Sequence, residues 1–129
     1  MDTLQSRRVQ VDLARNVFAP SNGRAVVRSL LSKDVPCSFM SDALLATSEL
    51  VSNALEHGHG ALEVLARFYL ERGLLRVEVS DSSSDVPRPR EELPTDLGGR
   101  GLHVVAAVSS DWGWTPNERG KTVWFELAS

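Results

Sequence analysis

Residues 49–58 read ELVSNALEHG, and this stretch decides how the rest of the chain is interpreted. It ends a longer segment that Ser38 or Ser41 can cap and in which apolar residues recur at helical spacing. The apolar positions are Met40, Ala43, Leu44, Thr47, Val51, Ala54 and Leu55, and the polar positions opposite them are Asp42, Glu49, Asn53 and Glu56. The pattern predicts an amphipathic helix with an aligned polar stripe, ending at Gly58.

Two residues of that stripe, Glu49 and Asn53, are one helical turn apart, so their side chains can meet above the helix. A carboxylate and an amide oxygen suit a magnesium ion and its retained waters, with phosphate oxygens completing the shell. The carboxylate can also orient or deprotonate an attacking hydroxyl. A solvated polar face would show the same spacing, so this pair indicates a site only in combination with other motifs.

The segments on either side of this helix show the patterns of strands and further helices. Alternating apolar residues predict strands and an antiparallel hairpin, and apolar residues three to four apart predict helices. The predicted strands are residues 7–12, 62–70, 75–79 and 122–127, and the predicted helices are residues 24–32, after a turn or cap at 20–22, and residues 102–109.

Asp81 ends the second run of the hairpin in the same parity as its apolar residues, so we expect its side chain on the apolar side of the sheet. An acceptor there invites a donor such as the exocyclic amine of adenine, although an Asp that caps a strand would look the same. Residues 82–101 follow as a loop of about 20 residues, and loops of this length are usually functional lids or binding loops, or else disordered. The glycine run at residues 98–101, just before a helix, can bring backbone N–H groups onto a phosphate, although a flexible hinge would look the same.

The composition limits the class of protein. A chain of 129 residues, 42% of them hydrophobic, suits one domain over residues 1–129. The formal net charge of -3 with scattered arginines gives no basic footprint for nucleic acid. No apolar run approaches the roughly 18 residues of a membrane span. The one cysteine, Cys37, excludes an internal disulfide and favours a reducing compartment, so we expect a cytoplasmic protein. Because the charge gives no footprint for nucleic acid, we expect protein or small-molecule partners.

The ordered motifs resemble those of the GHKL, or Bergerat-fold, ATPases, and within them the anti-sigma-factor serine/threonine kinases. The N-box pattern ELVxNAxxHG of that family is similar to residues 49–58, and the Asp that opens its next box is similar to Asp81. Its glycine-rich lid box is similar to residues 98–102, and a closing Gly-Lys-Thr is similar to residues 120–122. The resemblance covers nearly the whole chain. It implies an α+β fold, a two-layer α/β sandwich with a mixed, mostly antiparallel sheet and helices on one face.

The resemblance also implies ATP and Mg²⁺ as cofactors and gives roles to residues. Glu49 would be the general base, Asn53 the magnesium ligand and Asp81 the reader of adenine, with residues 82–101 as the ATP lid. The further nucleotide-binding residues that it suggests are His57, Gly99, Arg100, Gly101, Leu102, Lys121 and Thr122. His57 could equally interact with the helix dipole. The implied partners are an anti-sigma-factor antagonist that is phosphorylated and a sigma factor, and the resemblance favours a homodimer.

One motif departs from the family pattern. After its Asp the family continues x-Gly-x-Gly, whereas residues 81–85 read DSSSD. Ser83 and Asp85 add side chains where backbone would approach the nucleotide, and Asp85 adds negative charge near phosphates. Two functions therefore stay open: an ATP-dependent protein kinase, and a catalytically quiet module that binds its partners with little or no ATP turnover.

Overall fold

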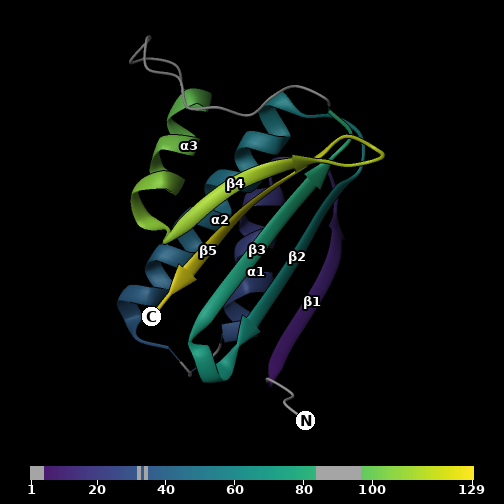
Figure 1. Cartoon of the computed structure of the whole chain (residues 1–129). Coiled ribbons are helices and arrows are strands. Elements are labelled where there is room, and N and C mark those ends of the chain that lie inside the picture. Colours follow the sequence, from purple (N-terminus) through teal and green to yellow (C-terminus); the bar gives the residue numbers. More distant parts are fainter. Residues whose placement is uncertain (1–4, 32, 34, 84–96) are drawn as a thin grey trace.

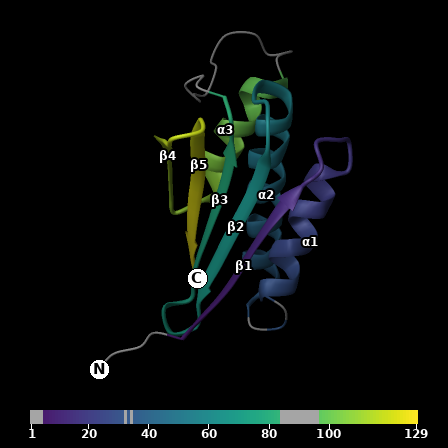
Figure 2. The same cartoon turned by 90° about the vertical axis from the view of Figure 1, so that its right-hand side faces the viewer.

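One antiparallel sheet carries three α-helices on one face in the computed structural model, which describes residues 5–31, 33, 35–83 and 97–129 (Figure 1). The helices are α1 (Ala19–Leu31), α2 (Cys37–His57) and α3 (Leu97–Val108). The strands, in spatial order, are β1 (Ser6–Leu13), β2 (Leu62–Tyr69), β3 (Leu74–Asp81), β5 (Lys121–Ala128) and β4 (Asp111–Pro116). Figure 2 shows the three helices on the same side of the sheet. This is the predicted α+β two-layer architecture, and neighbouring strands pair antiparallel throughout the described sheet.

The three central strands alternate between helix-facing and outward-facing side chains. β2, β3 and β5 each bury every second residue beneath the helices. Ala66, Val77 and Phe125 lie side by side in one cross-strand row and are fully buried. Removing such rows from water supplies the main driving force for joining the sheet to the helices. The predicted hairpin is confirmed, with the short 3-10 helix η1 (Leu70–Arg72) and a left-handed Gly73 joining β2 to β3.

The predicted helix over residues 49–58 is the second half of α2, which packs against both α1 and α3. Its predicted apolar face is confirmed, because those residues are buried or packed against the core; the buried residues of the helix are Phe39, Ala43, Ala46, Thr47, Leu50, Val51 and Ala54. Pro36 precedes the helix, and the Gly58 N–H donates to the Ala54 carbonyl at its end. Neither α2 nor any other helix in the described ranges is long and apolar enough to cross a membrane.

Helix α1 begins at Ala19, five positions before the start that the sequence pattern predicts. Residues 20–22 form its first turn and do not precede it as a separate turn or cap. Pro20 is compatible with this position because the first N–H groups of a helix have no partner within the helix. Val27, Leu30 and Leu31 then bury the predicted apolar face.

The C-terminal third differs from the sequence prediction in two places, a helix that begins earlier than predicted and a strand that was not predicted. Helix α3 begins at Leu97, so residues 97–101 form its first turns and are not the end of a loop. Residues 84–96 of the predicted lid lie outside the described residues. Strand β4 was not predicted, because Gly113 and Pro116 interrupt its apolar pattern. It is an edge strand whose tryptophans, Trp112 and Trp114, pack against the core.

Candidate functional site

Three segments meet at one end of the sheet: the end of β3, the start of β5 and the end of α2. Asp81, the last residue of β3, lies opposite Lys121, the first residue of β5, in the antiparallel register. Gly58 follows α2 and lies against the Asp81 carboxylate. The fold therefore brings the end of the ELVSNALEHG segment, Asp81 and the Gly-Lys-Thr segment to one place.

The Asp81 side chain points to the helix-covered side of the sheet, as its parity predicts, and the residue is only 5% exposed. Its Oδ1 atom accepts a hydrogen bond from the Ser83 N–H at 2.7 Å. A carboxylate that binds the N–H two residues later closes an Asx turn, which redirects the chain as it leaves the strand. Ser83 is buried as well, so a side chain occupies the interior where the family pattern has glycine.

The second partner of Asp81 is the ammonium group of Lys121. Its Nζ atom donates to Oδ1 at 3.2 Å and to Oδ2 at 3.3 Å. Lys121 is 4% exposed, so both charges of this ion pair lie inside the protein. Such burial is tolerated only when the charges compensate each other and share hydrogen bonds. The Asp81 carboxylate is thus bound by the protein itself.

Two glycines allow the backbone to approach this ion pair closely. A Cβ atom at Gly58 would overlap the Asp81 Oδ2 atom and would lie 2.7 Å from the Ala54 carbonyl oxygen. A Cβ atom at Gly120 would overlap the Asp81 carbonyl oxygen and would lie 2.6 Å from the Ser82 Cα atom. Neither glycine is in the left-handed region, so the requirement for glycine comes from close packing and not from backbone conformation.

Glu49 and Asn53 lie one turn apart on α2, and both are half-buried. Burial raises the pKa of the Glu49 carboxyl above its ordinary value of 4.5, and the negative charge of Glu56 raises it further. A general base works best when its pKa approaches the working pH, so this shift favours proton transfer by Glu49. A carboxylate that is only half-desolvated also stays accessible to a substrate hydroxyl.

His57 is the last residue of α2, and its Nε2 atom lies 3.6 Å from the Glu56 Oε2 atom. Both side chains are partly exposed to solvent. This position agrees with the interaction between a histidine and the negative end of the helix dipole. A role of His57 in nucleotide binding stays a prediction.

The lid-box residues fall in α3. Gly99, Arg100 and Gly101 are in its first turns, and their side-chain environments lie outside the described residues. Leu102 is buried and belongs to the core. The N–H groups of the first turn of a helix have no intrahelical partners and attract anions. The glycine run therefore lies in the first turns of α3. The sequence pattern predicted it just before the helix, because it placed the helix start five positions later, at Leu102.

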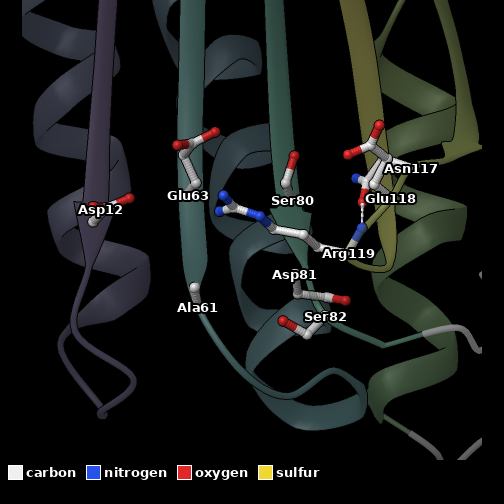
Figure 3. Close-up of a pocket in the computed structure, with 9 residues that line it drawn as sticks. All are labelled: Asp12, Ala61, Glu63, Ser80, Asp81, Ser82, Asn117, Glu118 and Arg119. Carbon is white, nitrogen blue, oxygen red and sulfur yellow. Dashed lines mark hydrogen bonds between the residues drawn. The ribbon is translucent and has the colours of Figure 1, made fainter.

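Thr122 is separated from the other predicted site residues because it lies on the opposite face of the sheet. Its hydroxyl is 2.8 Å from the Ser80 Oγ atom and accepts a hydrogen bond from the Asn117 side-chain amide at 3.0 Å. A pocket of about 350 Å³ opens on this face near the β4–β5 turn (Figure 3). Its lining residues are Asp12, Ala61, Glu63, Ser80, Asp81, Ser82, Asn117, Glu118 and Arg119. The pocket shares Asp81 with the predicted nucleotide site, but the Asp81 carboxylate is turned to the helix side of the sheet.

Comparison with known protein families matches residues 13–127 to the histidine kinase-like ATPase domain. The chain belongs to this family. No curated protein sequence matches it significantly. Among solved structures, the histidine kinase-like ATPase domain described here is similar to the crystal structure of the RsbU and RsbW domains of Rv1364c from Mycobacterium tuberculosis. The two share 23% sequence identity with a TM-score of 0.70, over 94% of this chain and 32% of that one. The chain thus spans about a third of the solved protein, and the likeness shows the shared fold.

The residues of this ATPase domain fit the two ends of a magnesium nucleotide differently. No group of three or more His, Cys, Asp or Glu residues in the described part of the chain could hold a metal ion by itself. A magnesium ion would therefore take the Asn53 amide oxygen and complete its shell with phosphate oxygens and water, which is the usual pattern for this ion. At the other end, an adenine amine would have to reach a carboxylate that already binds Lys121.

The ion pair is the feature that sequence reasoning missed. Asp81 and Lys121 were each predicted to bind nucleotide, but they are 40 positions apart in the chain. Their contact depends on β5 pairing directly with β3, although α3 and β4 intervene in the sequence. One signal was present: Lys121 and Thr122 are neighbours in a strand, so their side chains must point to opposite faces.

Proposed function

We propose that this histidine kinase-like ATPase domain is an ATP-dependent protein serine/threonine kinase of the anti-sigma-factor type. Its substrate would be a serine or threonine hydroxyl of a small antagonist protein, and its other partner a sigma factor. Phosphorylation of the antagonist would then decide which partner the domain binds, with the domain acting in the cytoplasm and as a homodimer. The proposal is supported by the similarity of the fold to a solved structure that contains an RsbW domain.

The observation that carries the proposal is Glu49, a half-buried carboxylate with a raised pKa one helical turn from Asn53. Glu49 would accept the proton of the substrate hydroxyl as that oxygen attacks phosphorus. Asn53 would hold Mg²⁺ through its amide oxygen, and the N-terminal N–H groups of α3 would bind phosphate oxygens. Mg-ATP, when bound, would supply the γ-phosphoryl group and the countercharge for its transfer; the bond from the γ-phosphorus to the β–γ bridging oxygen would break and ADP would leave.

The test is incubation of the domain with γ-labelled ATP and candidate antagonist proteins. The proposal expects transfer of label to a serine or threonine, which peptide mapping identifies. Transfer should disappear with Glu49→Ala and persist with Glu71→Ala, which removes an exposed glutamate from η1 at the other end of the sheet. A native domain that binds ATP but transfers no label to any antagonist contradicts the kinase proposal.

A second function is favoured by the ion pair of Asp81 with Lys121 and by the buried Ser83. In this alternative the domain is a catalytically quiet module that binds its protein partners without nucleotide turnover. Its adenine-reading carboxylate would then serve only to hold β3 and β5 together. Calorimetry separates the two functions, because the quiet module should give no saturable heat with Mg-ATP.

A further inference from the structure

The Asp81 carboxylate has little acceptor capacity left for a ligand. Its Oδ1 atom accepts hydrogen bonds from the Ser83 N–H and from Lys121, and its Oδ2 atom accepts from Lys121 while contacting Gly58. A carboxylate offers about four lone-pair positions, and here the close approach of Gly58 blocks part of the space around Oδ2. A base amine that approached Asp81 would therefore meet the Lys121 ammonium in its place.

The exchange of these donors is costly but sterically simple. Moving Lys121 away from Asp81 separates two buried charges, which is unfavourable unless the ammonium reaches water. Lys121 is the first residue of β5, and Gly58, which lies against the same carboxylate at the end of α2, is partly exposed. The flexible four-carbon side chain of Lys121 thus has a short route from the interior to solvent. The same length of side chain in the middle of β5 would have no such route.

Resting on the nucleotide site proposed above, we propose that Lys121 is an internal, displaceable ligand of Asp81. The domain alternates between a closed state, in which Lys121 binds Asp81, and an open state, in which Lys121 is in water and Asp81 reads the amino group of an adenine nucleotide. Only the open state is competent for the base, so the apparent affinity falls by the fraction of open molecules. Lys121, which the sequence motif suggests as a nucleotide-binding residue, would thus compete with the nucleotide for Asp81.

Selective lysine labelling tests this proposal on the unmodified protein. The chain holds two lysines, Lys33 and Lys121, and Lys33 is exposed. Reductive methylation followed by peptide mass spectrometry therefore compares the methylation rate of the buried Lys121 with that of the exposed Lys33, which serves as an internal reference. Without nucleotide we expect Lys121 to be protected relative to Lys33. At saturating Mg-ATP we expect its methylation rate to rise at least severalfold while that of Lys33 stays constant.

A variant gives the second measurement. Lys121→Thr removes the competing ammonium and keeps a residue suited to a strand. We expect it to bind Mg-ATP about tenfold more tightly or better, as the closed state is lost. Lys121→Arg retains a charge that can pair with Asp81, so it should bind Mg-ATP more weakly than Lys121→Thr does. Lys33→Thr is the matched control for loss of a lysine. Circular dichroism establishes that each variant is folded.

The outcomes separate this inference from the proposed function. Binding of Mg-ATP by the wild type with Lys121 still protected overturns the inference and leaves the nucleotide site standing. Binding by Lys121→Thr but not by the wild type supports the inference. If the wild type binds Mg-ATP and a folded Lys121→Thr does not, the inference is overturned, because Lys121 then assists the nucleotide. If neither folded protein binds, both proposals are overturned.

Discussion

The two ends of the candidate site differ in how far the protein satisfies its own polar groups. On α2, Glu49 and Asn53 are half-buried and retain polar capacity for a ligand. At the ends of β3 and β5, Asp81 and Lys121 are buried and compensate each other. The first arrangement favours chemistry with an incoming molecule, whereas the second stabilises the fold. One set of motifs can therefore contain a phosphate end, Glu49 and Asn53, that is accessible to a ligand and a base end, Asp81 and Lys121, that must first be opened.

The largest expected effect comes from removing the general base at the phosphate end of the site. Glu49→Gln removes the general base but preserves the size of the side chain, so phosphoryl transfer should fall by about 10²- to 10⁴-fold. Nucleotide affinity should change little, because the proposed role of Glu49 is proton transfer. Single-turnover transfer and calorimetry measure the two quantities. Glu71→Gln is the control, and equal losses of binding and transfer would contradict the role.

The next effect comes from disrupting the ion pair between Asp81 and Lys121 at the base end of the site. Asp81→Asn removes the countercharge of Lys121, whose ammonium must then leave the interior for water, so the free energy of unfolding should fall by about 2–3 kcal/mol. Urea denaturation measures it. Asp12→Asn changes an exposed aspartate on β1 and should stay within about 0.5 kcal/mol of the wild type. A loss below about 1 kcal/mol for Asp81→Asn would mean that the ion pair is not maintained in solution.

A smaller effect tests the close packing beside the ion pair. Gly58→Ala places a methyl group against the Asp81 carboxylate and the Ala54 carbonyl oxygen, and it should cost about 1–3 kcal/mol of stability. The same substitution should weaken nucleotide binding, because it displaces the Asp81 carboxylate. Urea denaturation and calorimetry would report both changes. Unchanged stability would show that this end of the sheet adapts more easily than its geometry indicates.

The smallest effect concerns pH and Glu49. Because its pKa is raised in the folded state, the folded protein binds this proton more tightly than the unfolded chain does. The stability that Glu49 contributes is therefore fully present below its ordinary pKa and is lost as the pH rises through the raised value. Glu49→Gln should remove this decline and should stabilise the domain slightly at neutral pH, by up to about 0.5 kcal/mol. Urea midpoints between about pH 4 and 7 measure it, and a steeper decline in the variant would contradict the sign.

Local patterns predicted the parts of this structure that local physics determines. Helical and alternating periodicity located most of α2, the β2–β3 hairpin and β5, and the parity of the strand predicted the direction of Asp81. The edge strand β4 was missed because Gly113 and Pro116 weaken its pattern. The start of α3 was missed because glycines disfavour helices when judged without their tertiary contacts.

The candidate site was less predictable than the fold. The motif over residues 49–58 located Glu49 and Asn53, since both lie on one helix. The ion pair between Asp81 and Lys121 needed the strand order, which places β5 beside β3. Long-range pairing of this kind depends on the whole topology, and no short window of sequence contains it.

In the wild type, the phosphate end formed by Glu49 and Asn53 is accessible to a ligand, while Lys121 occupies Asp81 at the base end. Parallel titrations of the wild type with Mg-ATP and with magnesium tripolyphosphate, which lacks the base, test it most directly. ATP should bind less than about tenfold more tightly than tripolyphosphate, because the release of Lys121 offsets most of the contribution of adenine. An advantage of ATP of about a hundredfold or more would contradict it, since the base end would then be open from the start.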